Sequence, residues 1–272
     1  MQLQCARCSM ARRDTALQSF FLCDRCADLL KTNAFNNIAP SFKNFEIETY
    51  CGLCNERTVS HLMQWYLCPF CDRLANSYRL GRISQSFALT EWTRLVQPIV
   101  PDIKIEVVDQ VELSPYTRKA GKKRKLATQL DLRAHQGETP IFWIELKTGQ
   151  RSIDEFATFQ LDVSDCDDIL SVVKLTRIPA YVLHIQLEKQ YHPPSDHIVG
   201  KGIWWSDIFS MTDVFVKAER RQRDGGKMAA HFSPECFLPF ETFGEALKSN
   251  HHIIMRKRLD AEGPPRMYVL NP

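Results

Sequence analysis

Four Cys-x2-Cys pairs constrain this chain more than any other feature of its sequence. They use eight of its ten cysteines: Cys5/Cys8, Cys23/Cys26, Cys51/Cys54 and Cys68/Cys71. A gap of two residues lets one tight turn present two thiolates to the same metal ion, and zinc requires four such ligands in a tetrahedron. The spacing therefore predicts two metal sites, each made from two of the pairs.

An internal repeat predicts which pairs share a metal ion. The segments FFLCDRC (residues 20–26) and WYLCPFC (residues 65–71) are similar, and each follows another pair at nearly the same interval. The repeat favours two successive sites, made by Cys5, Cys8, Cys23 and Cys26 and by Cys51, Cys54, Cys68 and Cys71. Sequences that favour a helix follow each second pair, in residues 27–31 and 72–80. Each site therefore resembles a treble-clef zinc finger, with the zinc ribbon as the alternative.

Both metal ions are expected to be structural. All eight ligands are cysteine, so neither ion keeps an open position for catalysis, and binding would supply most of the folding energy of so small a region. Iron–sulfur clusters are the alternative occupants. Base deaminases also contain a Cys-x2-Cys pair, but the sequence has no His-x-Glu motif to go with it. Cys166 and Cys236 stand alone and are expected to be small buried residues.

Length and composition limit the class of protein. At 272 residues the chain has room for one full domain and a small appendage, and 44% hydrophobic residues are typical of a globular protein. No apolar run approaches the roughly 18 residues of a membrane span, and the N-terminus lacks the hydrophobic stretch of a secretory signal. We therefore expect a cytoplasmic protein. The net charge of +3 is too small to indicate a nucleic-acid partner by itself.

Strands are predicted through the second half of the chain. Residues 103–111, 126–134 and 141–147 have the apolar spacing of strands, and residues 135–140 have turn composition. Residues 179–187 read as a further buried strand, with residues 202–205 beside it.

The register of one predicted hairpin creates a polar site. If the chain turns about Glu138, Leu132 faces Ile144 and Leu130 faces Leu146 on a wholly apolar side. The same register places Asp131 opposite Glu145, with Cβ atoms roughly 4.5–5.5 Å apart. Strand alternation puts Lys147 on that side as well.

Two carboxylates and a lysine in this arrangement suit phosphodiester cleavage. Carboxylate oxygens are the hard ligands that Mg²⁺ prefers, and a bound Mg²⁺ polarises a phosphate and lowers the pKa of a bound water. An aspartate followed by Glu-x-Lys at the end of a hydrophobic strand resembles the PD-(D/E)XK nuclease superfamily. The resemblance covers roughly residues 80–205 and implies an α/β, restriction-endonuclease-like core, with a mixed central sheet flanked by helices.

The resemblance also implies a role for each residue of the site. Asp131 and Glu145, with the Leu146 carbonyl, would hold Mg²⁺ or Mn²⁺. Lys147 would orient the attacking water or help to deprotonate it. Glu91, in a helix predicted over residues 80–97, is the candidate for the metal-binding glutamate of the opening helix, with a solvated surface charge as the alternative.

A glutamine is a further candidate. A capping box at residues 152–155 predicts a helix that carries Gln160 on its inner face. Lys-Thr-Gly followed by a helical glutamine resembles the RecB-type branch of the superfamily, where this glutamine supports the active site. The alternative for Gln160 is an amide bonded to the backbone.

Two basic runs, residues 117–125 and 217–223, could contact nucleic acid. Phosphate backbones favour such clusters through counterion release, although basic loops are often only solvated. The first run lies next to the predicted carboxylates in the chain, which favours a contact with DNA. The residues predicted to bind are Arg118, Lys119, Lys122, Lys123, Arg124 and Lys125.

Together these features predict three segments: a tandem four-cysteine zinc-binding region (residues 1–76), a nuclease core (77–205) and a C-terminal subdomain packed on the core (206–272). The predicted function is that of a Mg²⁺-dependent DNA endonuclease of restriction, defence or mobile-element type, acting on duplex DNA that the zinc fingers recognise or clamp. It could act as a homodimer or in a larger nucleoprotein complex. The alternative is a non-catalytic adaptor, in which the fingers bind nucleic acid or protein and the nuclease fold is a relic.

Overall fold

The fold is described by a computed structural model and divides into two compact units. Met1–Ser86 with Leu187–Gly200 form the first unit, and Phe87–Gln186 with Lys201–Pro272 form the second. The residues described are 18–23, 41–42, 49–51, 54–55, 57–58, 63–67, 69–108, 130–190, 197–221 and 227–266. The sequence-based division at residues 76 and 205 stays a prediction.

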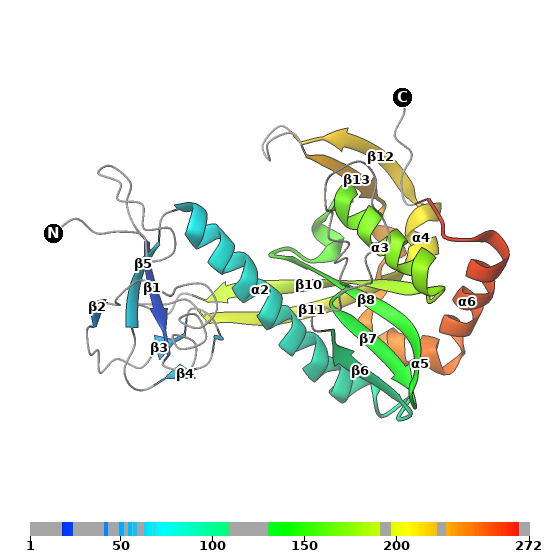
Figure 1. The fold of residues 1–272 in the computed structure, drawn as a ribbon, viewed down its shortest axis with the longest axis horizontal. Helices are drawn as coiled ribbons and strands as arrows, with labels where there is room; N and C mark the ends of the chain where they lie inside the picture. The colour runs from blue at the N-terminus through cyan, green and yellow to red at the C-terminus, as the bar shows by residue number, and fades with distance from the viewer. Residues whose placement is uncertain are drawn as a thin grey trace, which may run out of the picture. The chain divides into compact units, whose positions relative to one another are not determined.

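The short strands β1 to β5 lie in the first unit (Figure 1). β5 (Met63–Leu67) pairs antiparallel with β1 (Gln18–Leu22) on one side and with β2 (Ser41–Phe42) on the other. β3 (Thr49–Tyr50) pairs with β4 (Arg57–Thr58). β1 and β5 include the first three residues of the two repeated segments, so these parts of the repeat lie in neighbouring strands of one sheet.

One long helix contributes residues to both units. α2 (Pro69–Glu91) continues into a π-helical segment, η1 (Trp92–Val96), where Trp92 and Val96 are buried. The sequence predicts a helix after Cys71 and another over residues 80–97, and the structure joins the two without a break. Residues 27–31, where the other finger helix is predicted, lie outside the described residues. Among the helices described, none is both long and apolar enough to cross a membrane.

A mixed sheet of six strands carries the predicted site. Its order is β14-β11-β10-β8-β7-β6. The strands are β6 (Ile103–Val107), β7 (Leu132–Gln136), β8 (Thr139–Gly149), β10 (Ala180–Gln190), β11 (His197–Asp207) and β14 (Leu238–Pro239). β6, β7 and β8 are antiparallel, whereas β8 and β10 are parallel and connect through α3 (Val163–Thr176). A parallel pair needs such a crossover.

The β7–β8 hairpin has the predicted register near the site. Leu132 lies opposite Ile144, and both are fully buried. The turn is formed by Gly137 and Glu138, where Gly137 has φ +61°, and an irregularity follows Ala134. One expectation is wrong: Leu130 precedes the strand and packs with the core around α3.

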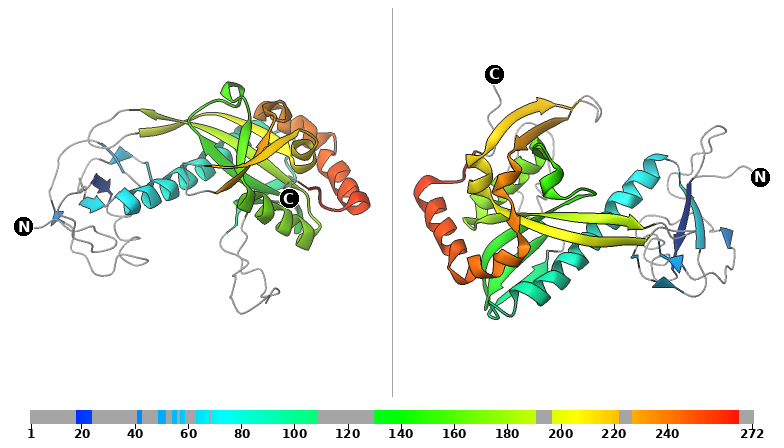
Figure 2. Two further views of the ribbon diagram at one scale, coloured as in Figure 1. Left: turned by 90° about the horizontal axis from the view of Figure 1, so that it is seen from above. Right: turned by 180° about the vertical axis from the view of Figure 1, so that it is seen from behind.

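Both faces of the central strands β8 and β10 are largely buried, and helices flank the sheet (Figure 2). On one face, Trp143 and Val182 belong to a core that includes Ile169 of α3. On the other, Phe142 and Tyr181 pack against Phe243, the first residue of α5 (Phe243–Lys248). Burial of both faces explains why β8 and β10 are nearly continuous apolar runs in the sequence. The predicted mixed α/β architecture is confirmed.

A smaller sheet and several short helices complete the second unit. The small sheet has the order β12-β13-β9, formed by β9 (Phe159–Asp162), β12 (Phe215–Arg220) and β13 (Met228–Phe232). The helices are η2 (Ile153–Glu155), α4 (Ile208–Asp213), η3 (Pro234–Cys236), η4 (Phe240–Thr242) and α6 (His251–Glu262).

The helix predicted after residue 152 is wrong in extent. The capping box at Ser152 exists, with Glu155 bonded back to the Ser152 N–H, but it starts only the 3-10 turn η2. The chain then forms β9, where Phe159 and Leu161 are buried and Gln160 between them is exposed. β9 pairs with β13, a partner some 70 residues further along the chain, and this pairing outweighs the local helix signal.

Candidate metal centre and active site

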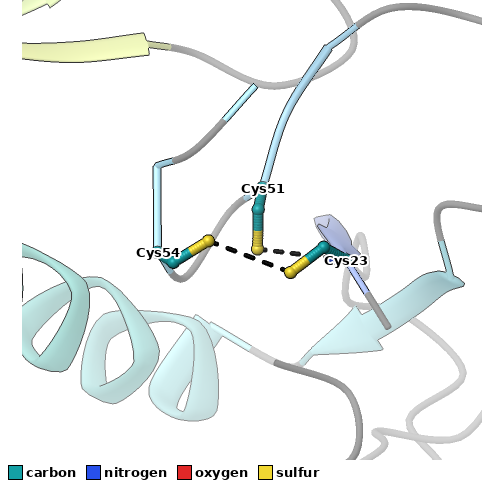
Figure 3. Close-up of side chains that lie close together, drawn as sticks. All are labelled: Cys23, Cys51 and Cys54. Atoms are coloured by element: carbon teal, nitrogen blue, oxygen red, sulfur yellow. Dashed lines mark hydrogen bonds between the residues drawn. The ribbon is translucent and has the colours of Figure 1, made fainter. Parts of the chain in front are cut away.

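Three cysteines from two distant segments meet in the first unit (Figure 3). The sulfur atoms of Cys23, Cys51 and Cys54 all lie within 4.8 Å of one another, and Cys23 Sγ is 3.8 Å from Cys54 Sγ. The backbone N–H of Cys23 donates to Cys51 Sγ at 3.4 Å. In a zinc tetrahedron with Zn–S bonds of about 2.3 Å, two sulfurs lie roughly 3.8 Å apart. The donor set and its spacing therefore fit a zinc ion.

This cluster corrects the predicted pairing of the cysteines. The sequence repeat groups Cys23 with Cys5 and Cys8, whereas the structure groups it with Cys51 and Cys54. The reason is that β1 and β5 pair with each other, so the repeated segments share one sheet instead of forming two successive fingers. Cys5, Cys8, Cys26 and Cys68 lie outside the described residues, and Cys71 lies in α2.

Asn55 anchors the turn that carries Cys51 and Cys54. Its backbone N–H donates to the Cys51 carbonyl, and its φ of 63° is in the left-handed region. Its side-chain amide bonds both ways with the backbone of Ile198, donating at 2.6 Å and accepting at 2.9 Å. Arg79, a buried residue of α2, donates to the same amide oxygen at 3.1 Å. The cysteine turn is thereby fixed to α2 and to the start of β11 within the first unit.

The predicted carboxylates and lysine come together in the second unit. Asp131 directly precedes β7, and its Oδ2 accepts a hydrogen bond from the Leu146 N–H of β8 at 2.8 Å. Glu145 and Lys147 are neighbours on one face of β8, where Lys147 Nζ lies 2.6 Å from Glu145 Oε1. The backbone between the two β8 residues is thus tied to the aspartate side chain.

The electrostatics of the site are unusual for surface carboxylates. Burial raises the pKa of Glu145 to about 7, and the nearby charge of Asp131 adds to the increase while Lys147 opposes it. Burial would lower the pKa of Lys147, but the charges of Glu145 and Asp165 outweigh it and raise that pKa above its ordinary value. The negative charges of Asp131 and Glu145 repel each other, and a bound divalent cation would offset this repulsion.

Asp165 is a residue of the site that the sequence analysis missed. It lies in the first turn of α3, and its Oδ2 accepts a hydrogen bond from Lys147 Nζ at 2.7 Å. The available signal was the acidic run Asp165, Asp167 and Asp168 at a helix start. The helix expected from residue 152 hides this signal, because the chain forms β9 before α3 begins.

Gly149, which ends β8, has a packing role. A Cβ at this position would lie 2.9 Å from Cε1 of the buried His184 ring. His184 is opposite Lys147 in the β8–β10 ladder, and its Nε2 lies 3.0 Å from the Arg151 carbonyl oxygen. Close packing between the two strands thus explains the glycine of the Lys-Thr-Gly sequence.

The other predicted site residues lie elsewhere. Glu91 binds Arg94 on the same helical segment. Gln160 is exposed in β9 opposite His231, so the expected inward-facing helical position is wrong. The basic run at residues 117–125 lies outside the described residues. In the second run, Lys217 pairs with Glu219 and Arg221 with Asp162.

Of the comparisons with known proteins, the one with solved structures gives matches. No protein-family model matches the sequence, and no curated protein matches it. Among solved structures, the chain is similar to Hjc of Archaeoglobus fulgidus, described as a Holliday junction resolvase from an archaeal hyperthermophile. The two are 12% identical, the match covers 59% of this chain and 97% of that chain, and the TM-score is 0.32. This TM-score is too low to assign a fold or to support a functional argument.

Proposed function

We propose that the chain is a divalent-metal-dependent nuclease that hydrolyses phosphodiester bonds in DNA. The observation that supports this best is the arrangement of Asp131, Glu145 and Lys147. A carboxylate pair lies at the junction of β7 and β8, beside a lysine held by charge on the same face of β8.

Asp131 and Glu145 are the proposed ligands of Mg²⁺ or Mn²⁺, with the Leu146 carbonyl as a third. The bond from the Leu146 N–H to Asp131 holds the aspartate against β8, close enough to Glu145 for their charges to interact. Oxygen donors of this kind match the preference of Mg²⁺. When bound, the metal would polarise the phosphodiester and lower the pKa of a water ligand.

Lys147 is proposed to act on the nucleophile and the phosphate. Its raised pKa means that the ammonium stays charged at neutral pH. A charged ammonium donates hydrogen bonds but accepts no proton. In this state Lys147 orients an attacking water or stabilises charge that develops on the phosphate oxygens.

The cysteine cluster is proposed to hold a structural zinc ion, with Cys23, Cys26, Cys51 and Cys54 as ligands. Three of these sulfurs already have zinc-like spacing, and Cys26 follows Cys23 at the interval of a Cys-x2-Cys pair. The remaining four, Cys5, Cys8, Cys68 and Cys71, are then left to form the second site. In this arrangement the second Cys-x2-Cys pair joins the third and the first joins the fourth, in place of the two successive sites that the repeat predicts.

A cleavage assay with Mg²⁺ tests the nuclease proposal. The full chain is incubated with duplex, single-stranded and branched DNA and with RNA, and products are resolved on denaturing gels. The wild type should cut DNA, and Asp131→Ala and Glu145→Ala should each lower the rate on the order of a thousandfold, because each removes a metal ligand. Mg²⁺ affinity should fall in both variants.

Two variants provide controls for this assay. Lys147→Ala should bind Mg²⁺ and DNA nearly as the wild type does but cut slowly. Glu138→Ala removes an exposed carboxylate from the turn of the same hairpin and should leave cleavage unchanged. Wild-type cutting by the Asp131→Ala, Glu145→Ala double variant would contradict the proposal, and inactivity of the wild type on every substrate would favour the adaptor function.

A further inference from the structure

Lys147 is held by two carboxylates from different elements. Its Nζ lies 2.6 Å from Glu145 Oε1 on β8 and 2.7 Å from Asp165 Oδ2 on α3. Asp165 is about one-third exposed, so this ion pair is partly shielded from water. These two charge-assisted contacts, one from β8 and one from α3, fix the position of the ammonium.

The position of Asp165 is fixed by the packing of α3. Cys166 next to it is fully buried, and so is Ile169 one turn further along. At the other end of the helix, Trp143 Nε1 donates to Thr176 Oγ1 at 3.1 Å. Trp143 and Lys147 are both on β8, so α3 is tied to this strand at both of its ends. Asp165 is therefore presented to Lys147 by a rigid helix and not by a loop.

Glu145 meets two demands that conflict. In the proposed nuclease it binds a divalent cation, yet in this structure it also binds the Lys147 ammonium. A cation at Glu145 repels the ammonium, and this repulsion is strong because the carboxylate is largely shielded from solvent. Without a second partner, Lys147 would lose its position when the metal binds.

We propose that Asp165 is the positioning residue that keeps Lys147 oriented toward the reacting groups while Glu145 is engaged by the metal ion. The inference rests on the proposed nuclease function. Asp165 acts through Lys147 and contributes no ligand to the metal. This role predicts that its loss changes turnover without changing metal or substrate binding.

The test is the cleavage kinetics of Asp165→Asn in the full chain, with Mg²⁺ titrated and the DNA that the wild type cuts best. The kcat should fall by on the order of 10- to 100-fold, as expected when a catalytic group is displaced. The KM for DNA and the Mg²⁺ concentration for half-maximal rate should stay within about twofold of wild type. Asp165→Glu, which keeps the carboxylate, should recover most of the rate.

Asp168→Asn is the matched control, because it removes the same charge from an exposed position of the same helix. It should leave kcat unchanged. Thermal unfolding checks that Asp165→Asn is folded. If it is not, Asp165→Glu and Asp165→Gln replace it, since they differ only in charge: an active Glu and a slow Gln variant would support the proposal.

Three results would overturn the inference. An unchanged kcat in Asp165→Asn would show that Lys147 needs no second anchor, while the nuclease function would stand. A raised Mg²⁺ requirement in Asp165→Asn would make Asp165 a metal ligand instead. Failure of the wild type to cleave any nucleic acid would overturn the proposed function and this inference with it.

Discussion

The two compact units are stabilised internally by different kinds of interaction. In the described part of the first unit, strands β1 to β5 are two to five residues long and three cysteine sulfurs lie close together. The amide of Asn55 links the turn that carries two of these cysteines to β11 and α2. The second unit has an apolar core on each face of a long sheet. A small region with little apolar surface depends on a few strong links, whereas a large core spreads its stability over many weak contacts.

Removing one sulfur ligand should have the largest effect of the substitutions, and this effect should be confined to the first unit. Cys54→Ser is expected to lose one of two zinc ions and to unfold the first unit, because apparent zinc-binding energies reach roughly 10–16 kcal/mol. The second unit should stay folded. Elemental analysis and hydrogen exchange of the two units measure both effects.

Cys236→Ser is the control for this substitution. Cys236 lies in the second unit, where its thiol donates to the Ser233 carbonyl at 3.2 Å, a bond that a serine hydroxyl can replace. Zinc content and exchange should be unchanged. Equal loss of protection in both units of Cys54→Ser would show that the contrast between them is false.

Asn55→Ala should destabilise the first unit by about 2–4 kcal/mol. It removes the two bonds to Ile198 and the one from Arg79, and it places a Cβ-bearing residue without a polar side chain at φ 63°. Asn250→Ala is a matched control, since Asn250 has φ 62° in the second unit without a side-chain capping bond. The difference in thermal stability between the two variants measures the contribution of the Asn55 side-chain hydrogen bonds. An equal loss of stability in both variants would show that backbone strain alone causes it.

The basic run at residues 117–125 gives a prediction about binding. Replacing Lys122, Lys123 and Arg124 by Ala should reduce the slope of log affinity for DNA against log salt by about 2 to 3, because each phosphate contact contributes roughly 0.9. A triple Ala variant of Lys248, Arg256 and Lys257, which are exposed on α5 and α6, removes the same charge as a control. Identical slopes in the two variants would show that the basic run is solvated and does not contact phosphates.

Glu145 should give the smallest effect and a dependence on pH. Its pKa is raised to about 7 in the folded protein from an ordinary 4.5, so the favourable contribution of its protonated form is complete below about pH 4.5 and is lost as pH rises through 7. Without added divalent cations, Glu145→Gln should therefore be more stable than wild type by on the order of 1 kcal/mol at pH 8 and equal to it at pH 4.

Chemical or thermal unfolding at the two pH values measures this difference. Glu138→Gln, in the exposed turn of the same hairpin, is the control and should show no gain at pH 8. A gain in stability of equal size at both pH values would show that the gain does not depend on the protonation of Glu145.

The sequence alone predicted the features that depend on local chemistry. The Cys-x2-Cys spacing marked the three cysteines whose sulfurs meet, and the alternation in β8 placed Glu145 and Lys147 on one face. The hairpin register followed from matching apolar residues, because a shift of one residue would have exposed Leu132 or Ile144. Each of these signals lies within one strand, one turn or one hairpin.

Only the tertiary structure decided which distant segments meet. It paired β1 with β5 and so gave Cys23 the partners Cys51 and Cys54, against the repeat in the sequence. It placed Gln160 in a strand, because β13 offered hydrogen-bond partners that no local pattern reveals. It also brought Asp165 to Lys147 by packing α3 along β8. These outcomes depend on the free energy of contacts between segments far apart in the chain, which local propensity and spacing do not contain.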